Sequence, residues 1–394
     1  MENFPLEGLR VIGLTQIIVG PVATRILASL GAEVITVEPP SPPPASHGQP
    51  TPPPFSEVNR GKLSISIDLN NPRGKDLFHG LVRASDVLVQ NYSPRAIRNL
   101  GVTYDELRRI NPGLVMVSVS AIEPEGPWSD IIAFGPGCDA LSGMSDLTGY
   151  ADGPPLKPGN FYADQSTAFH VAFAVLAALE QRRRTGKGQH IVAPLRRVLM
   201  ATIGEIFVEH SITGEPPRRM GNRDSSMAPH NVYPCEGEDN WIAIAVSSDQ
   251  EWLNLRRAMG DPPWASDVRF DTGEERLSHQ DEIDQHIREW TRNKGHLELM
   301  RHLQSHLVRA GAVLKSPEIL SQEQYQRRNI LDFVDVPEAG RFCSPGLAFR
   351  LSASPVNLGK ASPSYAQDTE QVLREILKLP QGEIEQLIAE RVVT

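Results

Sequence analysis

Short apolar runs and helix-like segments alternate along the first third of the chain. Each run has the length of a buried strand, and the segments between several of them carry apolar residues three or four positions apart, which is typical of a helix. The predicted strands cover residues 9–14, 33–38, 63–69, 86–89 and 114–119, and the predicted helices cover 22–30 and 72–84. Strands that alternate with helices form a mostly parallel sheet with helices on both faces.

A long helix is predicted from Asp164 to about Arg183. Its apolar residues recur at helical spacing and form one stripe: Ala168, Val171, Ala172, Val175, Leu176 and Leu179. Three arginines and then Gly186 and Gly188 follow, and basic residues before glycines are favourable at a helix C-terminus. A further helix is predicted over residues 196–211.

The pattern changes beyond residue 215. A strand at 241–246 and helices at 249–259, 281–293 and 296–310 predict a smaller α+β unit, and a helix at 369–377 closes the chain. This order predicts a second domain inserted within a larger one. The stretch Pro39–Pro54 is dense in proline, so it is expected to be an exposed, extended loop.

Composition narrows the class of protein. The chain has 394 residues, 40% of them hydrophobic, and a formal charge of −9, which argues against nucleic acid as the main partner. Its three cysteines fit neither a disulfide framework nor a zinc site. No secretion signal and no apolar run of membrane-spanning length is visible. These features predict a cytoplasmic protein without a membrane partner.

Several familiar motifs are incomplete. Gly186-Lys187 is followed by glycine where a phosphate-binding loop has Ser or Thr. The glycines of residues 135–140 do not connect an early strand to its helix, as a dinucleotide fingerprint would. His302 and His306 lie one helical turn apart, but the glutamate of a zinc hydrolase motif is missing between them. No metal site is therefore predicted.

Asp164 immediately precedes the long helix and supports two interpretations. The first is structural, because an acid here caps the helix by accepting its free N–H bonds. The second is catalytic, because the same N–H groups and the helix dipole hold the carboxylate ionised and directed. The residues alone favour the cap.

A resemblance to a known family changes this balance. The opening LEGLRVIGLTQIIVGPVATRILASLGAEVITVEPP resembles the N-terminus of the family III CoA-transferases, the CaiB/BaiF or formyl-CoA and carnitine type. Further segments in the same order resemble that family: NRGKLSISIDLNNPRGKDLF, SDVLVQNYSP, LGVTYDELRRINPGLVMVSVS, GPPLKPGNFYADQ and LAALEQRRRTGKGQ.

The resemblance implies an α/β fold with a Rossmann-like large domain built from both chain ends and a smaller inserted α+β domain. The expected boundaries are 1–195 for the first part of the large domain, 196–221 for a linker, 222–325 for the small domain and 326–394 for the return. It also implies an interlocked dimer, either a homodimer or a heteromer with a related subunit.

The resemblance also implies the chemistry. The family's nucleophilic aspartate matches Asp164, which would carry CoA from an acyl-CoA donor to an organic acid through covalent intermediates. Succinyl-CoA is the donor expected by analogy. No permanently bound cofactor is expected, because coenzyme A enters as part of the substrate.

Three positions match the family's CoA contacts, Ile17, Ile67 and Asn91, and Arg98 is a fourth candidate that lies one position before the place of a family arginine. Core packing is an equal alternative for the two isoleucines, and a turn with Ser93 is an equal alternative for Asn91. The chain departs from the family where Pro39 and Asn99 replace arginines, and the glycine-rich flap of the formyl-CoA enzymes is missing.

Other functions of the same fold stay open. Related acyl-CoA racemases pair the aspartate with a histidine, but this chain has Gly137-Cys138-Asp139 at that place. An intramolecular CoA transfer, which is an isomerase reaction, would use the same Asp164. A non-catalytic CoA-binding subunit of a hetero-oligomer is the alternative from a different class.

Overall fold

The computed structural model describes residues 4–40, 57–129, 131–328, 330–336, 340–356 and 361–394. The chain forms two compact units. The first contains Met1–Ser145, Lys157–Glu215 and Arg328–Thr394, and the second contains Asp146–Leu156 and Pro216–Arg327. Most of the expected loop Pro39–Pro54 lies outside the described residues.

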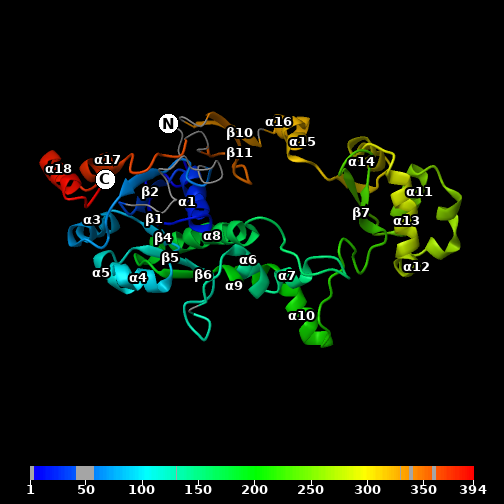
Figure 1. Cartoon of the computed structure of the whole chain (residues 1–394), viewed down its shortest axis with the longest axis horizontal. Helices are drawn as coiled ribbons and strands as arrows, with labels where there is room; N and C mark the ends of the chain where they lie inside the picture. Colours follow the sequence, from blue (N-terminus) through cyan, green and yellow to red (C-terminus); the bar gives the residue numbers. More distant parts are fainter. Residues whose placement is uncertain (1–3, 41–56, 130, 329, 337–339, 357–360) are drawn as a thin grey trace. The chain divides into compact units, whose positions relative to one another are not determined.

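A six-stranded sheet forms the centre of the first unit (Figure 1). Its strands are β1 (Arg10–Leu14), β2 (Glu33–Glu38), β3 (Leu63–Ser66), β4 (Val87–Gln90), β5 (Val115–Ser120) and β6 (His190–Pro194). All neighbours pair in parallel in the order β3-β2-β1-β4-β5-β6. This is the Rossmann-like order, in which ligands bind where the order reverses, between β1 and β4.

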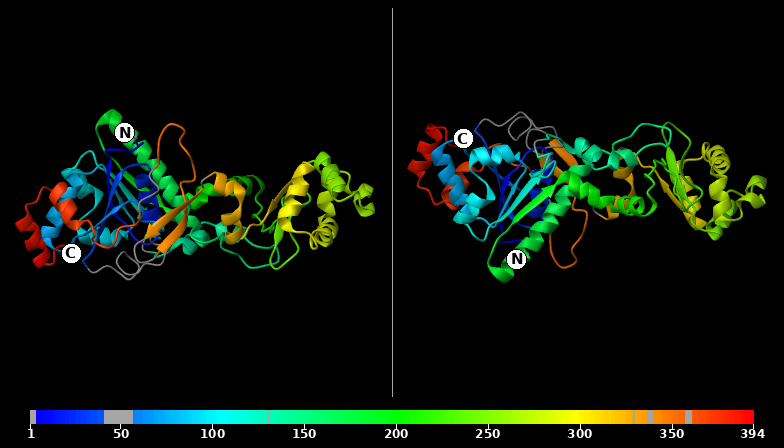
Figure 2. Two further views of the ribbon diagram at one scale, coloured as in Figure 1. Left: turned by 90° about the horizontal axis from the view of Figure 1, so that it is seen from above. Right: turned by 90° about the horizontal axis from the view of Figure 1, so that it is seen from below.

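Helices cover both faces of this sheet, as Figures 1 and 2 show from three directions. On one face α1 (Val19–Ser29) packs against α8 (Tyr162–Thr185). The other face carries a separate apolar core with α3 (Pro72–Arg83), α4 (Pro94–Leu100), α5 (Tyr104–Ile110), α17 (Thr369–Glu375) and α18 (Gln381–Ala389). The predicted two-faced parallel sheet is confirmed.

The C-terminal part of the chain returns to the first unit. It closes the open edge of β3, where Ser64 N–H donates to Asp368 Oδ2 at 2.8 Å and Ser66 N–H donates to Thr369 Oγ1 at 3.1 Å. An antiparallel hairpin of β10 (Leu331–Val336) and β11 (Gly340–Pro345) precedes this return. Both ends of the sequence therefore build the first unit.

The second unit has its own antiparallel sheet of β7 (His230–Pro234), β8 (Trp241–Ala245) and β9 (Arg309–Ala312). Buried Trp252 and Phe270 meet edge to face in its core. Around the sheet lie α11 (Asp249–Ala258), α12 (Gly273–Ser278), α13 (Gln280–Thr291) and α14 (His296–Ser305), and α15 (Ser316–Ser321) and α16 (Glu323–Arg327) end this part of the chain. The short 3-10 turns Pro263–Ser266 and Val268–Phe270 complete it.

Three sequence expectations need correction. The helix predicted over 296–310 ends at Ser305, because Leu307 takes a left-handed conformation (φ 60°) and the chain then pairs with β8 as β9. The helix predicted over 196–211 is two helices, α9 (Leu195–Thr202) and α10 (Gly204–Thr213), interrupted at Ile203. Leu176, predicted in the buried stripe of α8, is 38% exposed.

The segment expected as a linker, 196–221, contains most of α9 and all of α10, and it belongs to the first unit as far as Glu215. Two short helices, α6 (Gly135–Leu141) and α7 (Met144–Leu147), precede α8 in the sequence. Among the described ranges, no helix is both long enough and apolar enough to span a bilayer.

Candidate active site

Asp164 lies in the first turn of α8, not at its N-cap. The N-cap residue is Phe161, which has a left-handed backbone (φ 57°), and Tyr162 and Ala163 precede Asp164 within the helix. The N-cap residue makes no side-chain capping bond. A non-glycine residue in this conformation is strained, and such strain is common beside functional groups. Asp164 therefore does not occupy the N-cap position that the capping interpretation assigned to it.

A second helix N-terminus meets the same carboxylate. The backbone N–H of Val19, the first residue of α1, lies near enough to the Asp164 carboxylate to lower its pKa, and so does the N–H of Asp164 itself. The N-cap of α1, Ile18, supplies no side-chain bond of its own. Two helix dipoles with free N–H groups thus face one carboxylate, which favours negative charge there.

The third wall of the site is α6. A Cβ atom added to Gly135 would lie 2.3 Å from Asp164 Oδ2, so a larger residue here would force the carboxylate or the helix to shift. Asp139, four residues further on this helix, is 2% exposed, and its Oδ1 has no hydrogen-bond partner among the described residues. A buried, unsatisfied carboxyl oxygen is costly, and such groups concentrate at functional sites.

Burial and the nearby carboxyl of Asp139 both affect the charge of Asp164. Burial raises the pKa of Asp164 to about 6; the two nearby N–H groups act to lower it, and the negative charge of Asp139 acts to raise it. Burial likewise raises the pKa of Asp139. A carboxyl with a pKa of about 6 is roughly nine tenths ionised at pH 7, yet it is poorly solvated and therefore reactive.

Cys138 occupies the place of the racemase histidine, but it is not equipped as a base. Burial, and then the negative charge of Asp164 and Asp139, raises the pKa of the Cys138 thiol to about 12. Its Sγ donates to the carbonyl oxygen of Ala121 at 3.5 Å. The thiol therefore stays protonated at neutral pH, and the structure offers no thiolate to remove a proton.

Asn91 and Ile17 lie at the reversal of strand order. Asn91 follows β4, and its side-chain amide pairs with the backbone of Gln16: Gln16 N–H donates to Oδ1 and Nδ2 donates to the carbonyl, both at 2.8 Å. Ile17 is 36% exposed and has a left-handed backbone (φ 65°), a genuine outlier for a β-branched residue. Ser93, the alternative turn partner of Asn91, instead caps α4 by accepting from Ala96 N–H.

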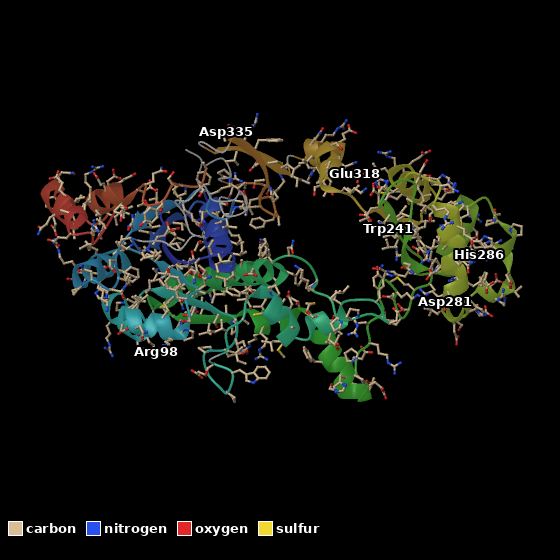
Figure 3. The ribbon with its side chains drawn as sticks, viewed as in Figure 1. Arg98, Trp241, Asp281, His286, Glu318 and Asp335 are labelled. Atoms are coloured by element: carbon tan, nitrogen blue, oxygen red, sulfur yellow. The ribbon has the colours of Figure 1, made fainter. Side chains whose placement is uncertain are left out.

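The other two predicted contacts lie elsewhere. The side chain of Ile67 is 1% exposed and packs in the apolar core on the α3 face, as the core-packing alternative predicts for this side chain. Arg98 is exposed on α4 (Figure 3) and lines a cavity of about 140 Å³ together with Tyr104 and His190. Tyr104 and His190 stack with ring centroids 5.1 Å apart, and Ser118 Oγ lies 2.8 Å from His190 Nε2.

The fold thus brings together three of the predicted site residues: Ile17, Asn91 and Asp164. Gln16 and Ile17 belong to the turn that leads into Val19 of α1; Asn91 bonds to Gln16, and the N–H of Val19 lies near Asp164. Sequence reasoning missed Gly135 and Asp139 as site residues. Their signal was the glycine-rich segment GPGCD, which fitted no phosphate-binding fingerprint and needed another explanation.

Metal ligation finds no support in the part of the chain that the structure describes, where no group of three or more His, Cys, Asp or Glu residues is arranged to hold an ion. His302 Nε2 lies 2.8 Å from the carbonyl oxygen of Ala258, and His306 Nδ1 lies 2.9 Å from that of His302. Both histidines therefore have backbone partners.

A Rossmann-like sheet with a desolvated carboxylate beside its reversal point defines an α/β protein with an ionisable group at the edge where such sheets bind ligands. The model of CoA-transferase family III matches residues 6–369 of this chain. The chain belongs to this family, and it is a CoA-transferase of acyl-CoA metabolism.

Known proteins are similar to this chain over nearly its whole length. The chain is 32% identical to a succinyl-CoA–D-citramalate CoA-transferase of Chloroflexus aurantiacus, over 99% of this chain and 98% of that one. It is 31% identical to a succinate–glutarate CoA-transferase of Agrobacterium fabrum, over 94% and 96%. A crystal structure of a CAIB/BAIF family protein from Brucella suis is similar with a TM-score of 0.87 and 28% identity, over 95% and 100%.

Proposed function

We propose that the protein transfers CoA from an acyl-CoA to an organic acid and that Asp164 is the covalent nucleophile. The observation that carries this proposal is the enclosure of one carboxylate by three elements. The N-termini of α8 and α1 direct N–H groups to it, and Gly135 of α6 leaves the space that its Oδ2 occupies. A cap or an ordinary core residue needs no such arrangement.

The reaction follows from the charge of the group. Ionised Asp164 attacks the thioester carbonyl of the donor, the carbon–sulfur bond breaks, and a mixed anhydride and CoA thiolate form. The thiolate then attacks the aspartyl carbonyl and releases the donor acid, which leaves an aspartyl-CoA thioester. Covalent catalysis divides a difficult exchange between two acids into acyl transfers of similar energy.

The acceptor acid completes the cycle. Its carboxylate attacks the aspartyl thioester and releases CoA thiolate, and the new mixed anhydride is then opened by the thiolate at the acceptor carbonyl. The acceptor leaves as its CoA thioester and Asp164 is free again. Each step develops an oxyanion beside Asp164, where the N–H of Val19 and the dipoles of two helices stabilise negative charge.

CoA binds, in this proposal, across the carboxyl ends of β1 and β4. Exposed Ile17 and the turn that Asn91 fixes support contacts with the nucleotide end. Arg98 is proposed to contact a CoA phosphate, which its exposed guanidinium on α4 allows. Ile67 is proposed to contact CoA through its backbone alone, because its side chain is buried.

Succinyl-CoA is the proposed donor. Two of the relatives carry succinyl-CoA or succinate in their names, and both are over 30% identical to this chain. The relatives named for formyl-CoA and oxalate are 29% identical or less, and the chain lacks the glycine-rich flap expected of them.

A dimer is proposed as the working form, either with a second copy or with a related subunit. Its support is apolar surface on the first unit: Phe173 on α8 is 74% exposed, and α10 has no buried residue although it carries Phe207, Val208 and Ile212. Three free cysteines support a cytoplasmic location, because thiols persist in reducing compartments. Light scattering of the purified protein tests the dimer.

The test of the function is trapping of the covalent intermediate. The protein is mixed with succinyl-CoA, quenched with hydroxylamine and digested, and the peptide that contains Asp164 is examined by mass spectrometry. We expect a hydroxamate on Asp164 that is absent from Asp164→Asn. CoA binding without any hydroxamate, for succinyl-CoA and for a panel of other acyl-CoAs, would instead support a non-catalytic subunit, and exchange of the α-proton would support a racemase.

A further inference from the structure

The side chain of Asn91 continues the pairing of β1 with β4 beyond the end of both strands. The last paired residues are Leu14 and Gln90. Asn91 comes next, and its amide bonds to Gln16 in both directions: Gln16 N–H donates to Oδ1, and Nδ2 donates to the Gln16 carbonyl oxygen, both at 2.8 Å. Asn91 therefore holds the start of the turn, residues 15–18, that joins β1 to α1.

The same amide lies against the helix that follows the turn. A Cβ added to Gly20, the second residue of α1, would lie 3.1 Å from Cγ of Asn91 and 2.7 Å from the side chain of Thr15. The first turn of α1 thus packs closely against Asn91. One side chain contacts the chain both before and after the strained part of the turn.

The strained residue is Ile17, which has a left-handed backbone at φ 65°. This conformation is unfavourable for a β-branched side chain, and it persists only where the surroundings determine it. The two bonds from Asn91 hold Gln16, the residue immediately before it. In this conformation the side chain of Ile17 is 36% exposed, whereas that of Ile18 is 3% exposed.

We propose that Asn91 is a positioning residue for acyl-CoA: its amide holds the turn of residues 15–18, and with it Ile17, in the shape that binds CoA. The proposal assigns Asn91 no bond to CoA itself, since Gln16 already uses Oδ1 and one of the two Nδ2 hydrogens. It rests on the CoA site of the proposed function, which lies where the strand order reverses.

The first test is Asn91→Ala, which removes both bonds to Gln16. We expect the Kd of free CoA, measured by calorimetry, and KM for acyl-CoA to rise about tenfold. The reason is that the released turn relaxes, so only a fraction of the molecules has the shape that binds CoA. KM for the acceptor acid should change less than about twofold, because the acceptor reacts with the enzyme that already carries CoA.

A second variant separates positioning from a direct bond. Glycine adopts a positive φ without strain, so Ile17→Gly no longer needs the support of Asn91. Alone, Ile17→Gly weakens CoA binding a few-fold, because the apolar contact is lost. Added to Asn91→Ala, it should recover CoA affinity by about threefold. A direct bond from Asn91 to CoA predicts instead that the two losses multiply.

The matched control is Asn111→Ala. The amide of Asn111 also holds backbone groups: Nδ2 donates to the carbonyl oxygens of Val82 and Ser85 at 2.9 Å, and Oδ1 accepts from Gly113 N–H at 3.0 Å. Asn111 precedes β5, so it lies at the amino end of the strands, opposite the proposed CoA site. This variant should lower the melting temperature at least as much as Asn91→Ala does and leave KM for acyl-CoA unchanged.

If Asn91→Ala does not fold, Asn91→Asp replaces it, because aspartate keeps the shape and the acceptor for Gln16 N–H but loses the donor. The same recovery by Ile17→Gly is expected.

Two failures are distinguishable. Absence of both CoA binding and an Asp164 hydroxamate in the wild-type protein overturns the proposed function. If the wild-type protein shows both, the positioning role alone is overturned by unchanged CoA affinity in the Asn91 variant, by losses that multiply in the double variant, or by an equal rise of KM in Asn111→Ala.

Discussion

Substitution of Gly135 by alanine is the sharpest test of the site geometry. The added Cβ would lie 2.3 Å from Asp164 Oδ2, whereas ordinary contact begins at 3.4 Å. One of the two groups must therefore withdraw by about 1 Å, and Gly135 belongs to a helix while the carboxylate ends a side chain. A misplacement of about 1 Å at a reacting group lowers the rate by about 100-fold.

Gly137→Ala on the same helix is the matched control. The nearest atom to its added Cβ is the methyl carbon of Ala133 at 3.1 Å, which needs to yield by only a few tenths of an ångström. Neither glycine has a positive φ, and alanine is the better helix former by about 1 kcal/mol. Both variants are therefore expected to stay folded.

The assay compares initial rates of CoA transfer and the yield of Asp164 hydroxamate for the wild-type protein and the two variants. We expect kcat of Gly135→Ala to fall about 100-fold while Gly137→Ala stays within a few-fold. Circular dichroism melting verifies that both are folded. Full activity of Gly135→Ala would refute the reasoning, because the carboxylate beside Gly135 would then not be the reacting group.

Three further outcomes follow from the charges at the site. Asp164→Asn removes a carboxyl whose pKa is raised from 3.8 to about 6, so it should stabilise the fold at pH 8 by up to about 3 kcal/mol. In urea titrations this gain shrinks as pH falls through 6 and is absent below about pH 4, and a pH-independent difference would contradict the cause. Asp139→Asn should shift the acidic limb of the kcat profile to lower pH, because Asp139 raises the pKa of Asp164; an upward shift would contradict this. Iodoacetamide at pH 8 should alkylate exposed Cys343 and spare Cys138, whose pKa of about 12 keeps it protonated; equal rates would show that the thiol is accessible.

The sequence by itself determined the parallel sheet and most of its helices. Four of its strands were readable because a strand buried on both faces is a continuous apolar run. The strand predicted at 63–69 was readable from its alternation of apolar and polar residues. Asp164 was identifiable too, since the motif around it resembles one family closely. The resemblance could not show that Asp164 lies in the third position of α8 and not at its cap, because the left-handed residue Phe161 that sets this start carries no sequence signal.

Only the tertiary structure decided which groups surround that carboxylate. Val19 comes from α1, and Gly135 and Asp139 come from α6, so all three are distant from Asp164 in sequence. Local pattern says nothing about such contacts. Their effect also opposes simple expectation: helix N-termini should lower the pKa of an acid, but burial outweighs them and raises it. That residue 164 is an aspartate is known from the sequence, whereas the pKa of its carboxyl depends on the packing that removes water from it.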